Sequence, residues 1–261
     1  MKNKKEENLT MKKILLIGAG NVATNVGLGL KQAGYEIVAC YSRTGEAAHQ
    51  LANELKTVAL SELTALPAHD LILICIPDDQ IALVIPQLPT DSNIAYTSGT
   101  VSLNELPKTH KIGVFYPLQT FTKNKIIELK TVPFFVESND KQLEDKLLST
   151  AKQIGLRAEI TSSEQRKQIH IAAVFVNNFT NHLAYLAKQH VEKHQLSWEN
   201  LLPLLAETFA KINTENPKEI QTGPARRNDL NVIEKHLNEL SGNEKEIYKA
   251  ITDSILHTYH A

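Results

Sequence analysis

The stretch that decides the fold is Ile14-Leu15-Leu16-Ile17-Gly18-Ala19-Gly20-Asn21-Val22-Ala23. Its first four residues form an apolar run that is typical of a buried strand. Glycines at positions 18 and 20 follow, and the residues after them have the amphipathic pattern of a helix. The sequence therefore predicts a strand, a tight glycine turn and a helix in direct succession.

The spacing of Gly18, Gly20 and Ala23 matches the phosphate-binding turn of dinucleotide-binding proteins. Gly18 allows the turn, Gly20 lets the backbone approach a pyrophosphate, and Ala23 keeps the helix close to the strand. The free N–H groups at the start of the helix attract phosphate charge. The same glycine pattern occurs in turns without a ligand, but the strand before it and the helix after it favour dinucleotide binding.

A second strand is predicted at residues 35–41, and Ser42-Arg43-Thr44 follows it. A protein that binds NAD usually has Asp or Glu at this point, where the carboxylate binds the ribose hydroxyls. Two hydroxyl groups and a guanidinium suit a 2′-phosphate instead. We therefore expect NADP(H) as the cofactor, although an arginine in a loop is more often a solvated surface charge.

The composition excludes several classes of partner. The chain has 261 residues, and its 28 Lys and Arg against 29 Asp and Glu give a net charge of −1. This balance predicts no general affinity for nucleic acid or membrane. Cys40 and Cys75 lie in apolar runs and are expected to be buried, reduced thiols and not a disulfide or a metal site. We expect residues 1–10 to be a flexible tail and the protein to be cytoplasmic.

Strand and helix patterns alternate from residue 11 to residue 161, which predicts a Rossmann-type domain with a doubly wound, mainly parallel sheet. The expected strands are 12–17, 35–41, 56–60, 70–76, 92–96, 112–116, 132–137 and 157–161. The clear helices are 21–33, 45–55 and 140–154. A ligand of such a sheet lies at the carboxyl ends of its strands.

The pattern changes at residue 162, where Ser162 and Gln165 have the spacing of a capping box at a helix start. From there on only helices are predicted, at 163–193, 198–213, 229–240 and 243–258. The sequence thus predicts a second, all-helical domain over residues 162–261, which would bind substrate or form a dimer.

Polar loops follow three of the predicted strands. Pro77 and two carboxylates follow strand 70–76, and Thr97-Ser98-Gly99-Thr100 follows strand 92–96. The small residues of the second loop would let a nicotinamide lie close to the backbone. The loop Tyr116-Pro117-Leu118-Gln119-Thr120-Phe121 could line a substrate pocket. The two carboxylates either cap the helix that follows or lie beside the ribose of the cofactor.

The long predicted helix at 163–193 carries His170, Asn177 and Asn181 at spacings of seven and four residues, which places them on one face of a regular helix. Between them lies the nearly apolar run 171–176. Polar groups in such surroundings need partners. Either they are satisfied within the protein, or His170 donates or accepts a proton while Asn177 orients a substrate.

The last candidate is the loop Thr222-Gly223-Pro224-Ala225-Arg226-Arg227-Asn228-Asp229. Gly223 and Pro224 indicate a turn, and Asp229 is expected to cap the next helix. The loop could simply be solvated. Alternatively, Arg227 binds an anionic group of the substrate or crosses a dimer interface.

Taken in order, the motifs GAGNVA, SRT, CIPD, TSGT, YPLQTF, HIAAVFVNN and GPARRND resemble those of a bacterial family of Rossmann-like proteins that have a helical C-terminal domain and are named as NADP oxidoreductases. The resemblance covers residues 11–261. The N-terminal half is also similar to pyrroline-5-carboxylate reductase and to deazaflavin-dependent NADP oxidoreductase, and more distantly to β-hydroxyacid dehydrogenases. Relatives of this kind commonly form homodimers through the helical domain.

The resemblance implies a set of site residues. The cofactor-binding residues would be Gly18, Gly20, Asn21, Val22, Ser42, Arg43, Thr44, Ile76, Pro77, Thr97, Ser98 and Gly99. The family's helix motif matches His170, Ala172 and Ala173, and its loop motif matches Gly223, Pro224, Arg227 and Asp229. Tyr116 replaces a histidine that often opens the HPLQTF loop, which weakens the argument for acid–base chemistry at that position.

Two departures from better-known relatives leave the substrate open. The β-hydroxyacid dehydrogenases have a catalytic lysine where this chain has His170, and Lys167, one turn earlier, is not in their motif. The helical-domain motif of the pyrroline-5-carboxylate reductases, Ser-Pro-Gly-Gly-Thr-Thr, is absent. The resemblance therefore implies the cofactor and the architecture, without a substrate.

Three functions are consistent with these observations. The first is an NADP(H)-dependent oxidoreductase that transfers hydride to or from a small carbonyl, imine or alcohol, with His170 as acid–base group, Asn177 as substrate orienter and Arg227 as anion clamp. The second is a sensor that binds NADP(H) without turnover, and the third is hydride transfer to a deazaflavin-type carrier. Turnover that depends on His170 would distinguish the first from the second.

Overall fold

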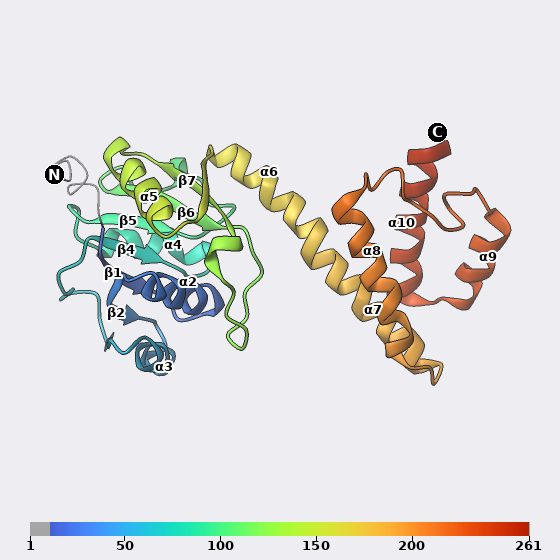
Figure 1. Cartoon of the computed structure of the whole chain (residues 1–261), viewed down its shortest axis with the longest axis horizontal. Helices are drawn as coiled ribbons and strands as arrows, with labels where there is room; N and C mark the ends of the chain where they lie inside the picture. The colour runs from blue at the N-terminus through green and yellow to red at the C-terminus, as the bar shows by residue number, and fades with distance from the viewer. Residues whose placement is uncertain (1–10, 261) are drawn as a thin grey trace. The chain divides into compact units, whose positions relative to one another are not determined.

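A computed structural model describes residues 11–260 of the chain (Figure 1). It divides into two compact units, Met1–Asn178 and Phe179–Ala261, which are described separately below. The predicted flexible tail at residues 1–10 lies outside the described residues.

The first unit is built on one eight-stranded sheet with the order β3-β2-β1-β4-β5-β6-β7-β8. All pairs are parallel except β6 with β7. This confirms the Rossmann-type fold and all eight predicted strands. The strands are β1 Lys13–Ile17, β2 Glu36–Tyr41, β3 Val58–Leu60, β4 Leu71–Ile74, β5 Asn93–Tyr96, β6 Lys111–Pro117, β7 Pro133–Ser138 and β8 Arg157–Ile160.

Strand β1 lies at the point where the strand order reverses, because the chain continues from β1 to β2 on one side and returns to β4 on the other. In open α/β sheets a ligand binds at such a switch point, outside the carboxyl ends of the strands. Gly18 directly follows β1. The fold therefore places the predicted phosphate-binding turn at the usual ligand-binding position.

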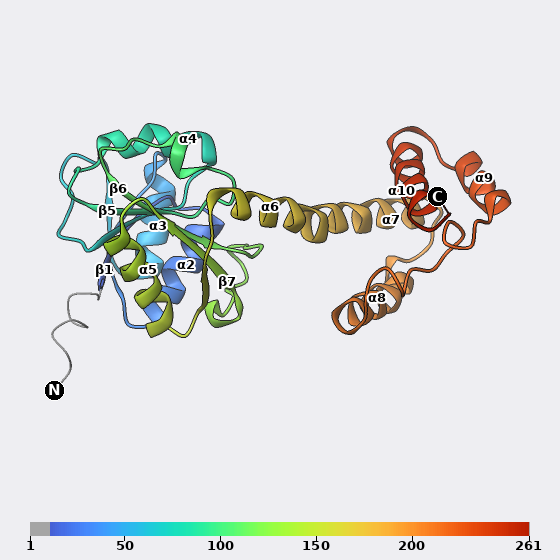
Figure 2. The same ribbon diagram turned by 90° about the horizontal axis from the view of Figure 1, so that it is seen from above.

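Helices cover both faces of the sheet (Figure 2). They bury its apolar side chains. One face packs against α2 Asn21–Gln32, α3 Gly45–Leu55 and α5 Lys141–Gln153. The other packs against α4 Asp78–Val84 and the short 3-10 turns that follow β4 and β5. Successive residues of β6 alternate between the two cores: Phe115 packs on the α2 side and Tyr116 on the α4 side. This alternation decides which strand-end side chains face α4.

The predicted long helix begins at the expected capping box, in which the Ser162 hydroxyl accepts from the Gln165 N–H and the Gln165 side chain accepts from the Ser162 N–H. It runs as α6 Ser163–Ala173, a π-helical turn Val174–Phe179 and α7 Thr180–Lys193. The π-helical turn is a difference from the regular helix that the sequence predicts. Such turns insert an extra residue into one helical turn and occur often at functional sites.

The second unit is helical, as predicted. It contains α7, α8 Leu202–Thr214, α9 Leu230–Glu239 and α10 Gly242–His260. Asp229 caps α9, since its carboxylate accepts from the Val232 N–H at 3.3 Å. The compact units divide after Asn178 because the start of α6 packs on the first unit, with Ile169 against the α4-side core. The predicted domain boundary at residues 161/162 stays a prediction.

Candidate functional site

The turn after β1 requires glycine at position 18. Gly18 has φ 116°, and a Cβ atom built on it would lie 2.1 Å from the carbonyl oxygen of Cys75. Its N–H donates to the carbonyl oxygen of Tyr41 at 2.7 Å, which fixes the turn between β2 and β4. Any side chain at this position would strain the backbone and push the neighbouring strand end away.

The start of α2 is open to an anion. Gly20 is its N-cap residue, and no side chain caps the helix or places an acid in its first turn. A Cβ atom built on Gly20 would meet no atom within 4 Å, so the space above the turn is free. Unpaired N–H groups and the helix dipole favour a phosphate here. These features fit the pyrophosphate of a dinucleotide.

The next two residues, Asn21 and Val22, differ in their exposure. Asn21 is exposed at the start of α2, and Val22 is half-buried against the α2-side core. Asn25, one turn further, is fully buried; it donates to the carbonyl oxygen of Thr122 at 2.9 Å and accepts from the Ile127 N–H at 3.0 Å. Asn25 thereby fixes the loop after β6 to α2. Sequence reasoning missed it, although a buried amide in an apolar helix face is a recognisable signal.

A cavity of about 570 Å³ opens beside this turn and extends over the ends of β2 and β4. It collects seven of the predicted cofactor-binding residues: Gly18, Gly20, Ser42, Arg43, Thr44, Ile76 and Pro77. The Ser42 and Thr44 hydroxyl oxygens lie 3.4 Å apart. Arg43 is exposed, and its side chain has no partner among residues 11–260. A guanidinium between two hydroxyl groups fits a 2′-phosphate.

The predicted Thr97–Gly99 segment does not line this cavity but forms the next strand-end loop. Thr97 is tied to the end of β4, because both its N–H and its hydroxyl donate to the carbonyl oxygen of Ile74, at 3.1 and 3.3 Å. The buried Ser98 hydroxyl accepts from the Thr100 and Val101 N–H groups at 3.1 and 3.0 Å. The Thr100 hydroxyl donates to Asp78 at the start of α4. The loop is therefore fixed by its own hydroxyl groups.

His170 and Tyr116 meet over Gly99. The Tyr116 phenol oxygen lies 3.0 Å from Nδ1 of His170. A Cβ atom on Gly99 would lie 2.7 Å from the same nitrogen and 2.8 Å from Cζ of Tyr116, so only glycine leaves room for this pair. Residues from a strand end, a strand-end loop and α6 thus converge at the carboxyl edge of the sheet. Sequence reasoning singled out His170 but not its contact with Tyr116.

Burial controls the ionisation of Tyr116. Desolvation raises the pKa of its phenol to about 12, with a further increase from the Asp78 charge and a partial decrease from Arg166. The phenol therefore keeps its proton at neutral pH. It can donate that proton in a hydrogen bond to His170 or accept one from a protonated ring.

The π-helical turn changes the predicted arrangement of Asn177. The prediction that His170 and Asn177 share one face assumes a regular α-helix. Asn177, however, lies within the π-helical turn Val174–Phe179. Because a π-helical turn contains an extra residue, Asn177 is rotated away from the face on which His170 lies. Asn177 is exposed. Its role as a substrate orienter stays a prediction.

The loop that contains Arg227 is a compact turn in the second unit. The Asp229 N–H donates to the carbonyl oxygen of Pro224 at 2.9 Å, and Gly223 has φ 102°. The two arginines differ: Arg226 lies 4.4 Å above the Tyr259 ring, whereas the exposed Arg227 side chain has no partner among residues 11–260. Arg227 is therefore the arginine of this loop that is available to an anion, and its role stays a prediction.

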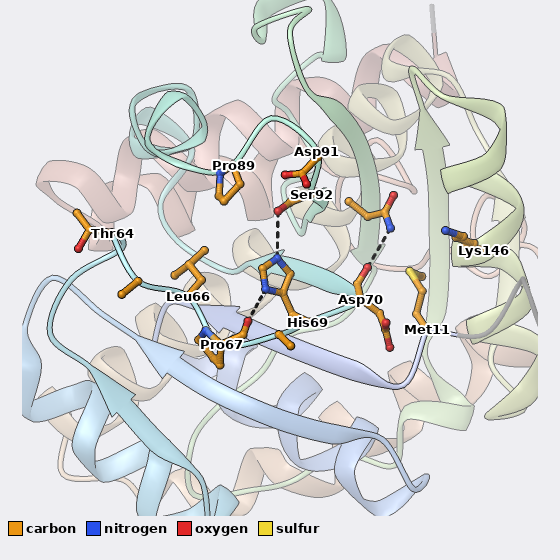
Figure 3. Close-up of a pocket in the computed structure, with 13 residues that line it drawn as sticks. Met11, Thr64, Leu66, Pro67, His69, Asp70, Pro89, Asp91, Ser92 and Lys146 are labelled. Carbon is orange, nitrogen blue, oxygen red and sulfur yellow. Dashed lines mark hydrogen bonds between the residues drawn. The ribbon is translucent and has the colours of Figure 1, made fainter.

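A second cavity, of about 600 Å³, lies at the opposite edge of the sheet (Figure 3). Figure 3 shows His69 between Pro67 and Ser92, with ring nitrogens 2.7 Å from the Pro67 carbonyl oxygen and 3.1 Å from the Ser92 hydroxyl. Asp70 accepts from the N–H groups of Lys12 and Lys13. These polar groups satisfy one another at the amino ends of the strands, so this cavity is not the candidate site.

Two families match the chain. Residues 13–98 match the family described as NADP oxidoreductase coenzyme F420-dependent, and residues 132–255 match a domain of unknown function, DUF2520. No curated protein sequence matches the chain.

A crystal structure of a Bacteroides fragilis protein, provisionally named an NADP oxidoreductase, is 35% identical to the chain. The match covers 96% of this chain and 99% of that one, with a TM-score of 0.86. The chain therefore belongs to the same family as this Bacteroides fragilis protein. In this chain, the match to the F420-dependent NADP oxidoreductase family precedes the match to DUF2520.

Two more distant structures share the fold of the family. Pyrroline-5-carboxylate reductase from Streptococcus pyogenes is 15% identical over 95% of this chain and 99% of that one, with a TM-score of 0.64. A reductive aminase from Aspergillus terreus is 13% identical over 95% of both chains, with a TM-score of 0.66. These two likenesses show the fold alone, whereas the family supports an NAD(P)-dependent oxidoreductase with NADP(H) as cofactor.

Two further observations concern other partners. Among residues 11–260, no helix is long and apolar enough to cross a membrane. The same residues contain no group of three His, Cys, Asp or Glu side chains that could hold a metal ion. Cys40 and Cys75 are buried and free, as predicted.

Proposed function

We propose that the protein is an NADP(H)-dependent oxidoreductase that transfers hydride to or from a small carbonyl, imine or alcohol, with His170 as its acid–base group. The observation that carries the proposal is the contact of His170 with Tyr116 over Gly99. The contact lies at the carboxyl edge of the sheet, the edge at which the turn after β1 also opens. That the turn and the contact lie at the same edge of the sheet supports a cofactor site beside a proton-transferring group.

The cofactor supplies hydride chemistry when it is bound, and the chain supplies binding, orientation and a proton. The N–H groups at the start of α2 would hold the pyrophosphate, and Ser42, Arg43 and Thr44 would hold the 2′-phosphate. Thr97, Ser98 and Gly99 form the loop against which the nicotinamide half would lie. His170 would give a proton to the substrate heteroatom or take one from it.

The substrate class is a proposal as well. The S. pyogenes relative is a pyrroline-5-carboxylate reductase, and the A. terreus enzyme was solved with NADPH4, cyclohexanone and allyl amine, which favours small C=O and C=N compounds for this chain. Asn177 would orient such a substrate, and Arg227 would bind an anionic group on it. The exposed and unpartnered Arg227 guanidinium supports the second role.

The test is a screen of NADPH oxidation against imines, 2-oxo acids and aldehydes, in wild type and in His170→Gln. For an accepted substrate we expect the variant to lose about 10²- to 10⁴-fold in turnover, with NADPH affinity little changed because His170 does not line the cavity beside the phosphate-binding turn. The matched control is His49→Gln, since His49 is exposed on α3. Full activity of His170→Gln would remove His170 from the proposal. Tight NADPH binding without turnover across the panel would favour a sensor instead.

A second acceptor is favoured by the family that matches residues 13–98, which is described as coenzyme F420-dependent. The same screen therefore includes a deazaflavin carrier as acceptor. Hydride transfer to the carrier alone, with none to the small molecules, would replace the proposed substrate class.

We also propose a homodimer formed through the helical unit. Helix α8 exposes Leu202, Leu204, Phe209 and Ile212, four large apolar side chains within four turns. Several large apolar side chains exposed on one helix support an interface there. Light scattering of the purified protein should give twice the chain mass, and a monomer at micromolar concentration would contradict the proposal. A cytoplasmic location stays a prediction.

A further inference from the structure

Arg166 is the largest fully buried side chain among the described residues, and its side chain has no exposed area. Its guanidinium donates to the Glu137 carboxylate on β7 and to the carbonyl oxygen of Val101 in the loop after β5. It also donates to the Tyr96 phenol oxygen at 3.3 Å. No sequence pattern singles out this residue, because arginine side chains are usually solvated.

Glu137 connects the same arginine to the first turn of α6. The Ser163 hydroxyl lies 2.9 and 2.8 Å from the two carboxylate oxygens of Glu137. It also accepts from the N–H of Leu103 at 3.2 Å. Arg166, Glu137 and Ser163 thus fasten the start of α6 both to a sheet strand and to the loop after β5.

These contacts run in order towards His170. Along α6, Ser163 meets the backbone at Leu103, Arg166 meets it at Val101, and His170 meets it at Gly99. Arg166 precedes His170 by four residues, so the two side chains lie on the same face of the helix. Two contacts of α6 with this backbone thus precede His170 along the helix.

Stability alone does not explain the ion pair of Arg166 with Glu137. An ion pair with a fully buried partner contributes little net stability compared with apolar side chains of similar size, because the Arg166 guanidinium loses its hydration. The Nε atom of Arg166 is buried and has no hydrogen-bond partner within residues 11–260, which adds to the cost. A forked cation does, however, fix three acceptors in one geometry, which apolar side chains do not.

We infer that Arg166 is a positioning residue, whose contacts with Glu137 and Val101 hold α6 so that the His170 ring stays against Tyr116 and Gly99. The inference rests on the proposed function for its effect on turnover, but the position of the His170 ring can be measured without any substrate.

The test is the double variant Arg166→Met/Glu137→Leu, which replaces the pair by apolar side chains and leaves no buried charge. Val101 keeps the Tyr96 phenol as a donor, at 2.9 Å. We expect a folded protein with NADPH affinity within about twofold of wild type. We expect the NMR signals of the His170 ring nitrogens to move, because the hydrogen bond from Tyr116 is weakened. Turnover should fall roughly 10- to 100-fold, as misplacement of a reacting group does.

The matched control is Arg157→Met/Glu159→Leu, which removes an exposed pair with a 3.5 Å contact on β8. It should leave the His170 signals and turnover unchanged. Arg166→Lys keeps the charge without the fork and should give an intermediate shift. Should Arg166→Met/Glu137→Leu not fold, Ser163→Ala removes the outermost contact and is expected to move the same signals.

Unchanged His170 signals in a folded variant would overturn the inference, and so would unchanged turnover. If wild type oxidises NADPH with none of the compounds in the panel, the proposed function fails. The His170 signals then decide the positioning role alone.

Discussion

The Tyr116 phenol oxygen lies 3.0 Å from Nδ1 of His170, although the two residues are 54 positions apart in the sequence. Nε2 of His170 has no hydrogen bond among residues 11–260. A phenol that stays protonated can donate to Nδ1, and a neutral His170 then carries its proton on Nε2. Tyr116 thus takes the orienting part that a carboxylate or carbonyl group plays for other histidines.

Removal of the phenol oxygen should impair His170 without removing it. We expect Tyr116→Phe to lower turnover about 10- to 100-fold, the loss of one hydrogen bond to a partly buried group. The NADPH affinity should not change. Steady-state kinetics and a cofactor titration measure the two quantities. The control is Tyr185→Phe, because Tyr185 is exposed in the second unit. Equal turnover of Tyr116→Phe and wild type would show that Tyr116 does not orient the ring.

Gly99 should tolerate no side chain. In Gly99→Ala the added Cβ atom would lie 2.7 Å from Nδ1 of His170, so the ring or the loop must move. We expect a stability loss of about 1–3 kcal/mol from overpacking, and turnover at least as low as in Tyr116→Phe. Chemical denaturation and kinetics measure both. Gly45→Ala is the control, since a Cβ atom at Gly45 meets no atom within 4 Å. Wild-type behaviour of Gly99→Ala would contradict the close packing of the three residues.

Arg43 should decide the preference for NADPH over NADH. We expect Arg43→Ala to weaken NADPH binding about 10- to 100-fold, the contribution of a charge-assisted hydrogen bond. NADH has no 2′-phosphate, so its affinity should not change. Fluorescence titration with both nucleotides measures the ratio. Arg157→Ala, an exposed arginine on β8, is the control. An equal loss for the two nucleotides would place Arg43 away from the 2′-phosphate.

The parts of the molecule that depend on local sequence could be predicted. The eight strands, the turn at Gly18 and the capping box at Ser162 each follow from a few neighbouring residues. The cavity beside β1 collects seven of the predicted cofactor-binding residues because the parallel order brings their strand ends together. Local patterns thus predicted which strand ends meet at this cavity, and the cofactor roles of these residues stay a prediction.

The parts that depend on contacts between distant residues could not be predicted. The pairs Tyr116–His170 and Glu137–Arg166 join separate elements, and no spacing in the sequence encodes them. The π-helical turn at Val174–Phe179 is another such case, because an apolar run has no pattern that reveals one extra residue in a turn. For this reason the prediction that His170 and Asn177 share one helix face did not include the π-helical turn that contains Asn177.

Ionisation of Tyr116 should also lower the free energy of unfolding at alkaline pH. Its phenol has a pKa of about 12 in the folded protein and an ordinary value of 10.0, so the folded state binds more protons between these values. The free energy of unfolding must therefore fall as the pH rises above 10. We expect Tyr116→Phe to reduce this fall by about 2 kcal/mol at most. Urea titrations at pH 8 and pH 11 measure it, and the same fall in both proteins would assign it to other groups.

Substitution of Arg226 should affect stability, whereas substitution of its neighbour Arg227 should affect substrate binding. Arg226 lies over the Tyr259 ring, so Arg226→Ala is expected to cost about 0.5–1 kcal/mol of stability. Arg227 has no side-chain partner among residues 11–260, so Arg227→Ala should leave the unfolding temperature unchanged.

If Arg227 binds the anionic group of the substrate, the variant should raise KM for a carboxylate-bearing substrate about 10- to 100-fold and not for an uncharged analogue. The comparison of the two substrates with both variants measures this. A loss of dimer mass in Arg227→Ala, with KM unchanged, would instead assign the residue to the interface between copies of the chain.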